Sequence, residues 1–280
     1  MLKCFFFVAL FQMILPKESS AQNNRFVDRF LLREGERENL RTIPVFSIYK
    51  DNYLVTGFRV TGEKIDQYSS DAKFQISLRH RLYKGPLPWD TYLFLTYTQK
   101  SFWDIYRDSS PFSETNYNPT VGVGKNFLRD GELAGIGMLQ FEHESNGRDS
   151  IWSRSWNKIS LTGIYVVNTR FTFEVKLWVP IVVAEENHNM ACYAGFGQAA
   201  VTYNNYNRRF SASVMMTKRA GWIFDANWQL EAAYKIFPRD EQYLFMQFYT
   251  GYGESMIGYE RFSRCLRVGI VIKPGALTIF

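Results

Sequence analysis

The sequence lacks a long hydrophobic run beyond its first residues. After Leu15, no segment contains the roughly 18 consecutive apolar residues that a membrane-spanning helix needs. The 280 residues also lack a Pro-, Gly- or Ser-rich linker and a long run of charge, so we expect a single domain. These absences exclude a helical membrane protein and a string of separately folded domains.

Histidine and cysteine are scarce. The three histidines, at positions 80, 143 and 188, lie far apart, and no histidine or cysteine has the spacing of a zinc site. Beyond Cys4, only Cys192 and Cys265 remain. Two unpaired thiols are favoured, although one disulfide stays open in an oxidising compartment.

Positive charge is in excess, but it is scattered. The net charge is +6, with no clustered basic stripe and no aromatic stacking platform, so the sequence gives little support for nucleic-acid binding. Such an excess would instead favour an anionic lipid surface.

The N-terminus has the pattern of a secretory signal peptide. Met1-Leu2-Lys3 precedes an apolar run from Cys4 to Leu15, and Ser19-Ser20-Ala21 follows as a cleavage site of small residues. We therefore expect a signal peptide over 1–21 and a mature domain over 22–280 that starts near Gln22. The alternative is a buried N-terminal helix.

Apolar and polar residues alternate along most of the chain. Between 171 and 179, Phe, Phe, Val, Leu and Val alternate with Thr, Glu, Lys and Trp, so one face of a strand is apolar and the other largely polar. No segment sustains a helical period. Aromatic residues make up 17% of the chain. This combination is typical of an antiparallel transmembrane β-barrel with an apolar wall and a polar lumen.

About twelve strands are predicted. Short turns alternate with longer connections, as expected for periplasmic and external ends of a barrel, and the chain ends in an aromatic, Phe280. The predicted strands are 52–62, 72–83, 90–101, 119–128, 133–145, 156–166, 170–180, 192–203, 209–217, 227–236, 242–251 and 266–280.

Polar residues interrupt the apolar face of one predicted hairpin. Leu139, Phe141, His143 and Ser145 share a parity, so His143 and Ser145 face lipid at the external end of their strand. Asn157 has the outward parity of the next strand, and the loop 146–156 can bring it beside His143.

A serine, a histidine and a third oriented polar group form a nucleophilic constellation. The histidine takes the serine proton, and the third group fixes the tautomer of the ring. An asparagine can act as this group because its carbonyl oxygen accepts from a ring N–H. Interfacial polar residues with no catalytic role are the alternative for His143 and Ser145.

These residues stand in a recognisable motif. The run from His143 to Arg148, followed by Ser153-Arg154-Ser155-Trp156-Asn157, resembles the signature of bacterial outer membrane phospholipase A. The resemblance covers most of the mature chain, including the segments 97–101, 109–112, 114–117, 174–178 and 249–255.

The resemblance implies a twelve-stranded barrel in a Gram-negative outer membrane. It implies calcium-dependent hydrolysis of phospholipid acyl esters at the outer leaflet, of phospholipase A1/A2 and lysophospholipase type, activated by homodimerisation. By motif, Ser145 is the nucleophile, His143 the base and Asn157 the group that orients His143. The backbone near Ser145 and Gly147 would stabilise the oxyanion.

The resemblance also implies a set of oxygen ligands for Ca²⁺, a hard cation. These are the Arg148 carbonyl, the Ser153 hydroxyl, Ser109 donated by the partner subunit, and Glu186, where the family has an acidic ligand. The role of Asp149 stays open. For Gln99, whose carboxamide has outward parity, the resemblance implies a hydrogen bond across the dimer, and contact with lipid headgroups is the alternative.

Two functions are weighed at this point. One is the dimeric phospholipase, and the other is a non-catalytic barrel, either a narrow pore or a structural protein. Glu142, Glu174, Lys176 and Arg267 have inward parity. A salt-bridged plug of these side chains would disfavour a pore.

Overall fold

The computed structural model describes residues 45–60, 65–83, 87–129, 132–237, 241–273 and residue 279. The predicted signal peptide and Phe280 lie outside these residues. Within the described ranges, no helix is long and apolar enough to cross a membrane.

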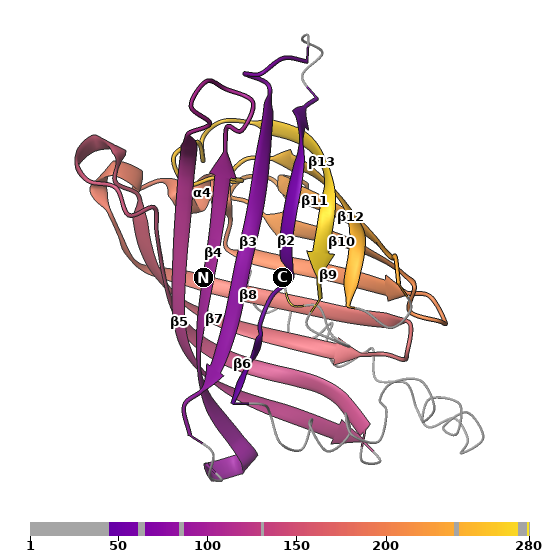
Figure 1. Cartoon of the computed structure of the whole chain (residues 1–280). Helices are drawn as coiled ribbons and strands as arrows, with labels where there is room; N and C mark the ends of the chain where they lie inside the picture. Colours follow the sequence, from indigo (N-terminus) through magenta and orange to yellow (C-terminus); the bar gives the residue numbers. More distant parts are fainter. Residues whose placement is uncertain are drawn as a thin grey trace.

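Antiparallel strands form most of the part of the chain that the structure describes (Figure 1). In the described ranges, three short 3-10 turns and one short helix lie between the strands, namely η1 (Pro88–Asp90), η2 (Ser150–Trp152), η3 (Glu185–Asn187) and α4 (Met190–Ala194). The strands are β1 (Phe46–Ile48), β2 (Asn52–Arg59), β3 (Ser70–Arg81), β4 (Thr91–Trp103), β5 (Phe112–Arg129), β6 (Glu132–Ser145), β7 (Ser155–Val166), β8 (Phe171–Val183), β9 (Gly197–Asn204), β10 (Phe210–Lys218), β11 (Ala226–Lys235), β12 (Gln242–Gly251) and β13 (Ser263–Ile272).

The sheet closes on itself. Each strand from β3 to β13 pairs with its sequence neighbour, and β13 pairs with β2, which pairs with β3. Both β1 and β2 pair with the same side of β3: β2 pairs with residues 70–75 and the short β1 with residues 78–80. The two therefore act as one strand of the barrel that is broken in the middle. The ring therefore has twelve positions, as the alternation predicted. Within the described residues, each strand from β2 to β13 has a strand partner on both sides, as a bilayer requires, because water cannot satisfy an open edge there.

Alternation of side chains separates the two faces of the wall. Leu139, Phe141 and Leu161 are 56%, 47% and 58% exposed, whereas the intervening Gln140 and Glu142 are each 2% exposed. The apolar residues therefore form the outer, lipid-facing surface, and the polar residues fill the lumen. This is the inside-out pattern that a membrane barrel needs.

Paired charges line the lumen. Lys176 Nζ lies 2.7 Å from Glu142 Oε1. Arg267 contacts Asp71 at 2.7 Å and Glu254 at 2.6 Å, and Lys73 lies 3.1 Å from Glu254. Burial alone would raise the pKa of Glu254. The positive charges of Lys73 and Arg267 outweigh this effect, so the pKa of Glu254 lies well below the usual range for a carboxyl group. The predicted inward charges Glu142, Lys176 and Arg267 thus make ion pairs within the lumen.

Some strand boundaries differ from the prediction. The strand expected over 192–203 starts only at Gly197, because α4 precedes it. This helix is held by packing, since Met190 is buried with Trp156, Trp178, Met256 and Tyr259 over the external end of the lumen. The strand expected at 119 begins at Phe112, and the last strand ends at Ile272 within the described residues.

Replacement of Arg267 by Met should destabilise the barrel. The change removes the bidentate partner of Asp71 and one of the two cations beside Glu254, so we expect the free energy of unfolding to fall by about 3 kcal/mol. The measurement is urea unfolding in detergent micelles, followed by tryptophan fluorescence. Arg264→Met is the matched control, because Arg264 lies on the same strand but is exposed. Equal losses in both variants would contradict the role given to the buried network.

Candidate active site on the outer wall

The β6–β7 hairpin brings the predicted site residues together. Its register places His143 opposite Asn157 and Ser145 opposite Ser155. His143 Nδ1 lies 2.8 Å from Asn157 Oδ1. Because a carboxamide oxygen only accepts, this contact places the ring proton on Nδ1 and leaves Nε2 free as a base.

The site lies on the lipid-facing surface. His143, Ser145 and Asn157 are partly exposed, and their neighbours along the same face, Phe141 and Ile159, are each 47% exposed. Ser145 is the last residue of β6. Among the described residues, no hydrogen bond joins Ser145 to His143, although the two side chains share a face.

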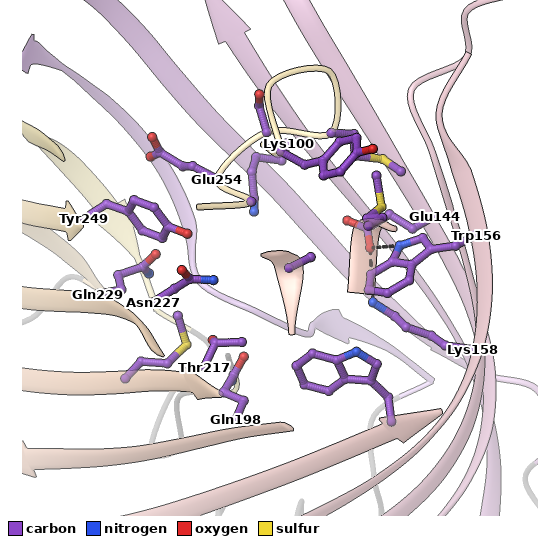
Figure 2. A pocket seen from close by; sticks show the side chains of 18 of the residues that line it. Lys100, Glu144, Trp156, Lys158, Gln198, Thr217, Asn227, Gln229, Tyr249 and Glu254 are labelled. Carbon is purple, nitrogen blue, oxygen red and sulfur yellow. Dashed lines mark hydrogen bonds and ion pairs between the residues drawn. The ribbon is translucent and has the colours of Figure 1, made fainter. Parts of the chain in front are cut away.

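The lumen behind this hairpin holds a different set of groups. Figure 2 shows Glu144, Trp156 and Lys158 on the wall of an internal cavity of about 180 Å³. Glu144 Oε2 accepts from Trp156 Nε1 at 2.9 Å and from Lys158 Nζ at 3.1 Å. These contacts fix the inner face of the two strands whose outer face carries His143 and Asn157.

The loop after Ser145 is organised by Asn146, which is 4% exposed. Its Oδ1 accepts from the Arg154 amide at 3.0 Å, and its Nδ2 donates to the Trp152 carbonyl at 2.8 Å. The next residue, Gly147, has φ +63°, and a Cβ there would lie 2.9 Å from the ring of Tyr117. Both the backbone conformation and the space therefore require glycine beside Ser145.

The predicted calcium ligands lie on external connections. Arg148 and Ser153 are in the loop after β6, Ser109 is in the β4–β5 connection with φ +61°, and Glu186 is an exposed residue of η3. Asn187, fully buried, accepts from the Ser155 amide and donates to its carbonyl, both at 3.1 Å. This pair of bonds holds the segment of Glu186 against the hairpin.

These residues do not form a metal cluster of the usual acidic kind. No group of three or more His, Cys, Asp or Glu that could hold a metal occurs in the part of the chain that the structure describes. The donors that are present are a carbonyl, two hydroxyls and one carboxylate. All four are hard oxygen donors, which is the chemistry that calcium prefers.

Gln99 lies on the outer face of β4, one strand from Tyr117 and two from Ser145. Tyr97 Oη donates to Gln99 Oε1 at 3.1 Å, and Gln99 Nε2 donates to Ser101 Oγ at 3.3 Å. The carboxamide facing lipid thus has partners within its own chain.

Two residues escaped the sequence analysis. The first is Asn118, whose Nδ2 donates to the His143 carbonyl at 2.8 Å. Strands β5 and β6 pair at Tyr117 and again at Thr120, but the two residues between these positions have no pairing partner in β6. Asn187 is the second, through its two bonds to Ser155. Pro119, which has no amide hydrogen, was the only sign that the ladder is interrupted here. Cys192 and Cys265 are both free, as favoured.

Comparison with known proteins identifies the family. The model of the family described as Phospholipase A1 matches residues 30–272. The chain belongs to the phospholipase A1 family. It is 31% identical over 239 residues to the phospholipase A1 of Salmonella typhimurium, covering 80% of each chain. It is 33% identical over 208 residues to that of Escherichia coli K12, covering 72% of this chain and 69% of the relative.

Solved structures of this family have the same fold. Outer membrane phospholipase A from Escherichia coli superposes with a TM-score of 0.72 at 27% identity, covering 85% of this chain and all of the other. The Salmonella typhi enzyme, solved as a dimer with bound calcium, gives 0.72 at 26% identity, covering 86% and 98%. An Escherichia coli active-site mutant with asparagine replaced by alanine gives 0.71 at 26%, covering 85% and 96%.

The family membership decides between the two functions weighed from the sequence. The chain is an outer-membrane phospholipase of a Gram-negative bacterium, and it hydrolyses phospholipids. The ion pairs of Lys176 with Glu142 and of Arg267 with Asp71 and Glu254 agree with this conclusion, because a salt-bridged lumen disfavours a pore.

Gly147→Ala should reduce phospholipid hydrolysis by at least about tenfold, because a residue with a Cβ disfavours this backbone conformation by roughly 1–2 kcal/mol and displaces the loop beside Ser145. The measurement is fatty acid release from mixed micelles. The control is Gly163→Ala on β7, where an added Cβ meets nothing within 4 Å. The account of the loop fails if the two variants lose activity equally.

Proposed function

We propose that this phospholipase cleaves acyl esters of outer-leaflet phospholipids with a Ser145–His143–Asn157 constellation, assisted by Ca²⁺ in a homodimer. One observation carries the proposal: the 2.8 Å contact between His143 Nδ1 and Asn157 Oδ1 on the lipid-facing wall, beside Ser145. The Escherichia coli relative solved as an active-site asparagine mutant supports a role for Asn157.

The first half-reaction forms an acyl-enzyme. His143 Nε2 takes the proton of Ser145 Oγ as this oxygen attacks the ester carbonyl carbon. Asn157 keeps the ring proton on Nδ1 and so holds the tautomer that this step needs. The Gly147 amide, which has no acceptor among the described residues, is available to the oxyanion of the tetrahedral intermediate. His143 then gives its proton to the departing lysophospholipid alcohol.

The second half-reaction releases the fatty acid. His143 takes a proton from water as the water oxygen attacks the acyl carbon, and the Ser145 oxygen leaves with the proton that His143 returns to it. Asparagine in place of aspartate brings no charge to the site, which lowers the cost of burying the site against hydrocarbon.

Arg148, Ser153 and Glu186, with Ser109 of a second subunit, would hold calcium next to the oxyanion position. A bound calcium ion supplies positive charge that stabilises developing negative charge on the substrate. The hard-oxygen donor set and the Salmonella typhi relative solved with calcium support this part of the proposal.

Dimerisation would cover the site from the side. Gln99, on β4, lies two strands from Ser145 on the same outer face, so a second barrel against β4 would stand next to the ester-cleaving groups. The Salmonella typhi relative is a dimer, and this supports a homodimer here.

Ser145→Ala should lower fatty acid release from phospholipid micelles by at least about a thousandfold. A calcium chelator should inhibit the unmodified enzyme reversibly. Ser155→Ala is the matched control, since Ser155 is the partner of Ser145 across the hairpin and is also partly exposed. Substantial activity in Ser145→Ala would remove Ser145 as the nucleophile.

Asn118→Leu should lower kcat about tenfold and leave KM nearly unchanged. The variant keeps the approximate size of the side chain but removes the hydrogen bond to the carbonyl of His143, so the base is held less well in line with Ser145. Asn118 is a positioning residue, and Asn118→Gln, which retains an amide donor, should recover part of the loss. A rise in KM with unchanged kcat would contradict this role.

A further inference from the structure

The loop between β10 and β11 carries the most exposed group of large apolar side chains in the described external loops. Trp222, Ile223 and Phe224 are 72%, 70% and 76% exposed. These values exceed the 58% of Leu161 on the lipid-facing wall. Contiguous apolar exposure of this kind marks an interaction site in a stable protein.

The loop is built to hold these side chains outward. Lys218 Nζ donates to the carbonyls of Arg219, Trp222 and Asp225, at 2.5, 2.7 and 3.1 Å. Asp225 Oδ2 accepts from the Trp222 amide at 2.7 Å. Gly221 has φ +107°, which admits the turn. The exposure therefore belongs to an ordered loop.

Two adjacent aromatic rings, flanked by a cation at each end, form a row beside this loop. The Arg219 guanidinium lies 4.7 Å from the Tyr252 ring centre. The rings of Tyr252 and Phe262 are 5.3 Å apart, and the Arg264 guanidinium lies 5.7 Å from the Phe262 ring centre. We call these four residues, together with 222–224, the β10–β13 rim.

Charge on the rim is only partly balanced. Arg219 has one carboxylate neighbour, Asp225, at 3.8 Å. Arg264 is exposed, has the outward parity of Val268 on β13, and makes no ion pair within the described residues. A guanidinium stacked on a ring keeps its N–H edge free for an anion, and phosphate matches that edge.

A second copy of the chain is a poor occupant for the rim. In the order of the ring, the rim runs from β13, three positions from β4, to β10, six positions from β4, the strand that carries the proposed dimer contact Gln99. The loop 222–224 therefore lies opposite the proposed dimer face. A lipid fits better, because aromatic and basic residues together favour the membrane interface, where acyl chains meet anionic headgroups.

We propose that the β10–β13 rim binds anionic lipid of the outer leaflet. Arg264 and Arg219 bind the headgroup phosphate, and Trp222 and Phe224 lie among the upper segments of the acyl chains. The rim is separate from the hairpin that carries Ser145, so it anchors and orients the barrel without taking part in ester cleavage.

Native mass spectrometry of the detergent-solubilised protein tests the headgroup contact. The probes are dialkyl-ether phosphatidylglycerol and dialkyl-ether phosphatidylcholine, which carry no acyl ester for the enzyme to hydrolyse. We expect tighter binding of phosphatidylglycerol and an affinity about fivefold lower in Arg264→Gln. Arg170→Gln, the same charge change at an exposed turn joining β7 and β8, is the control and should retain the affinity.

Three results would overturn the headgroup assignment. They are equal binding of the two lipids, equal loss in the Arg264 and Arg170 variants, and displacement of phosphatidylglycerol by millimolar inorganic phosphate, which would indicate a site for free phosphate. No outcome depends on catalysis, so the test stands apart from the proposed mechanism.

Quenching by brominated lipid tests the apolar tip. In vesicles of lipid brominated near the headgroup end of its chains, the emission lost to quenching should be larger for the unmodified protein than for Trp222→Phe. The difference should vanish in vesicles of lipid without bromine. Equal quenching in both proteins would show that Trp222 stays out of the bilayer.

Discussion

Closure of the backbone hydrogen-bond ladder is the constraint on which the rest of this molecule depends. In hydrocarbon an unpaired amide or carbonyl finds no water, so the sheet must return to its first strand. The pairing of β13 with β2 achieves this return. Once the ring is closed, every second side chain must face lipid and every other one the lumen. The outward direction of His143, Ser145 and Asn157 follows from this geometry.

The same constraint explains why the polar site residues on the outer wall depend on hydrogen bonds made on the lumen side of the same strands. The inner faces of β6 and β7 are fixed by the bonds of Glu144 to Trp156 and Lys158 (Figure 2). The outer faces are then free to carry a His–Asn pair with a short contact. Loops that fold over the external end of the lumen, through the packing of Met190 and Tyr259, complete a rigid frame behind the site.

Period-two alternation predicted the ring size, the outward site and the inward charges, because each depends only on local parity. Partners of buried charges could not be predicted from local parity, since the bond of Arg267 to Asp71, for example, joins residues 196 positions apart in the chain. Helix α4 was missed because a single turn has too few residues for a period and is held by tertiary packing. Asn118 could not be predicted because its side chain bonds to a backbone carbonyl of β6 at a gap in the β5–β6 pairing, and only the structure shows this gap.

The central claim is that the nucleophile stands on the lipid-facing wall and reacts with molecules that arrive through the bilayer. A long-chain alkyl sulfonyl fluoride, which transfers its sulfonyl group to an activated serine oxygen and releases fluoride, tests it directly. Peptide mass spectrometry after reaction in micelles should find one adduct, on Ser145, formed faster than with a short, water-soluble sulfonyl fluoride. An adduct on another residue, or faster reaction with the water-soluble reagent, would contradict the account.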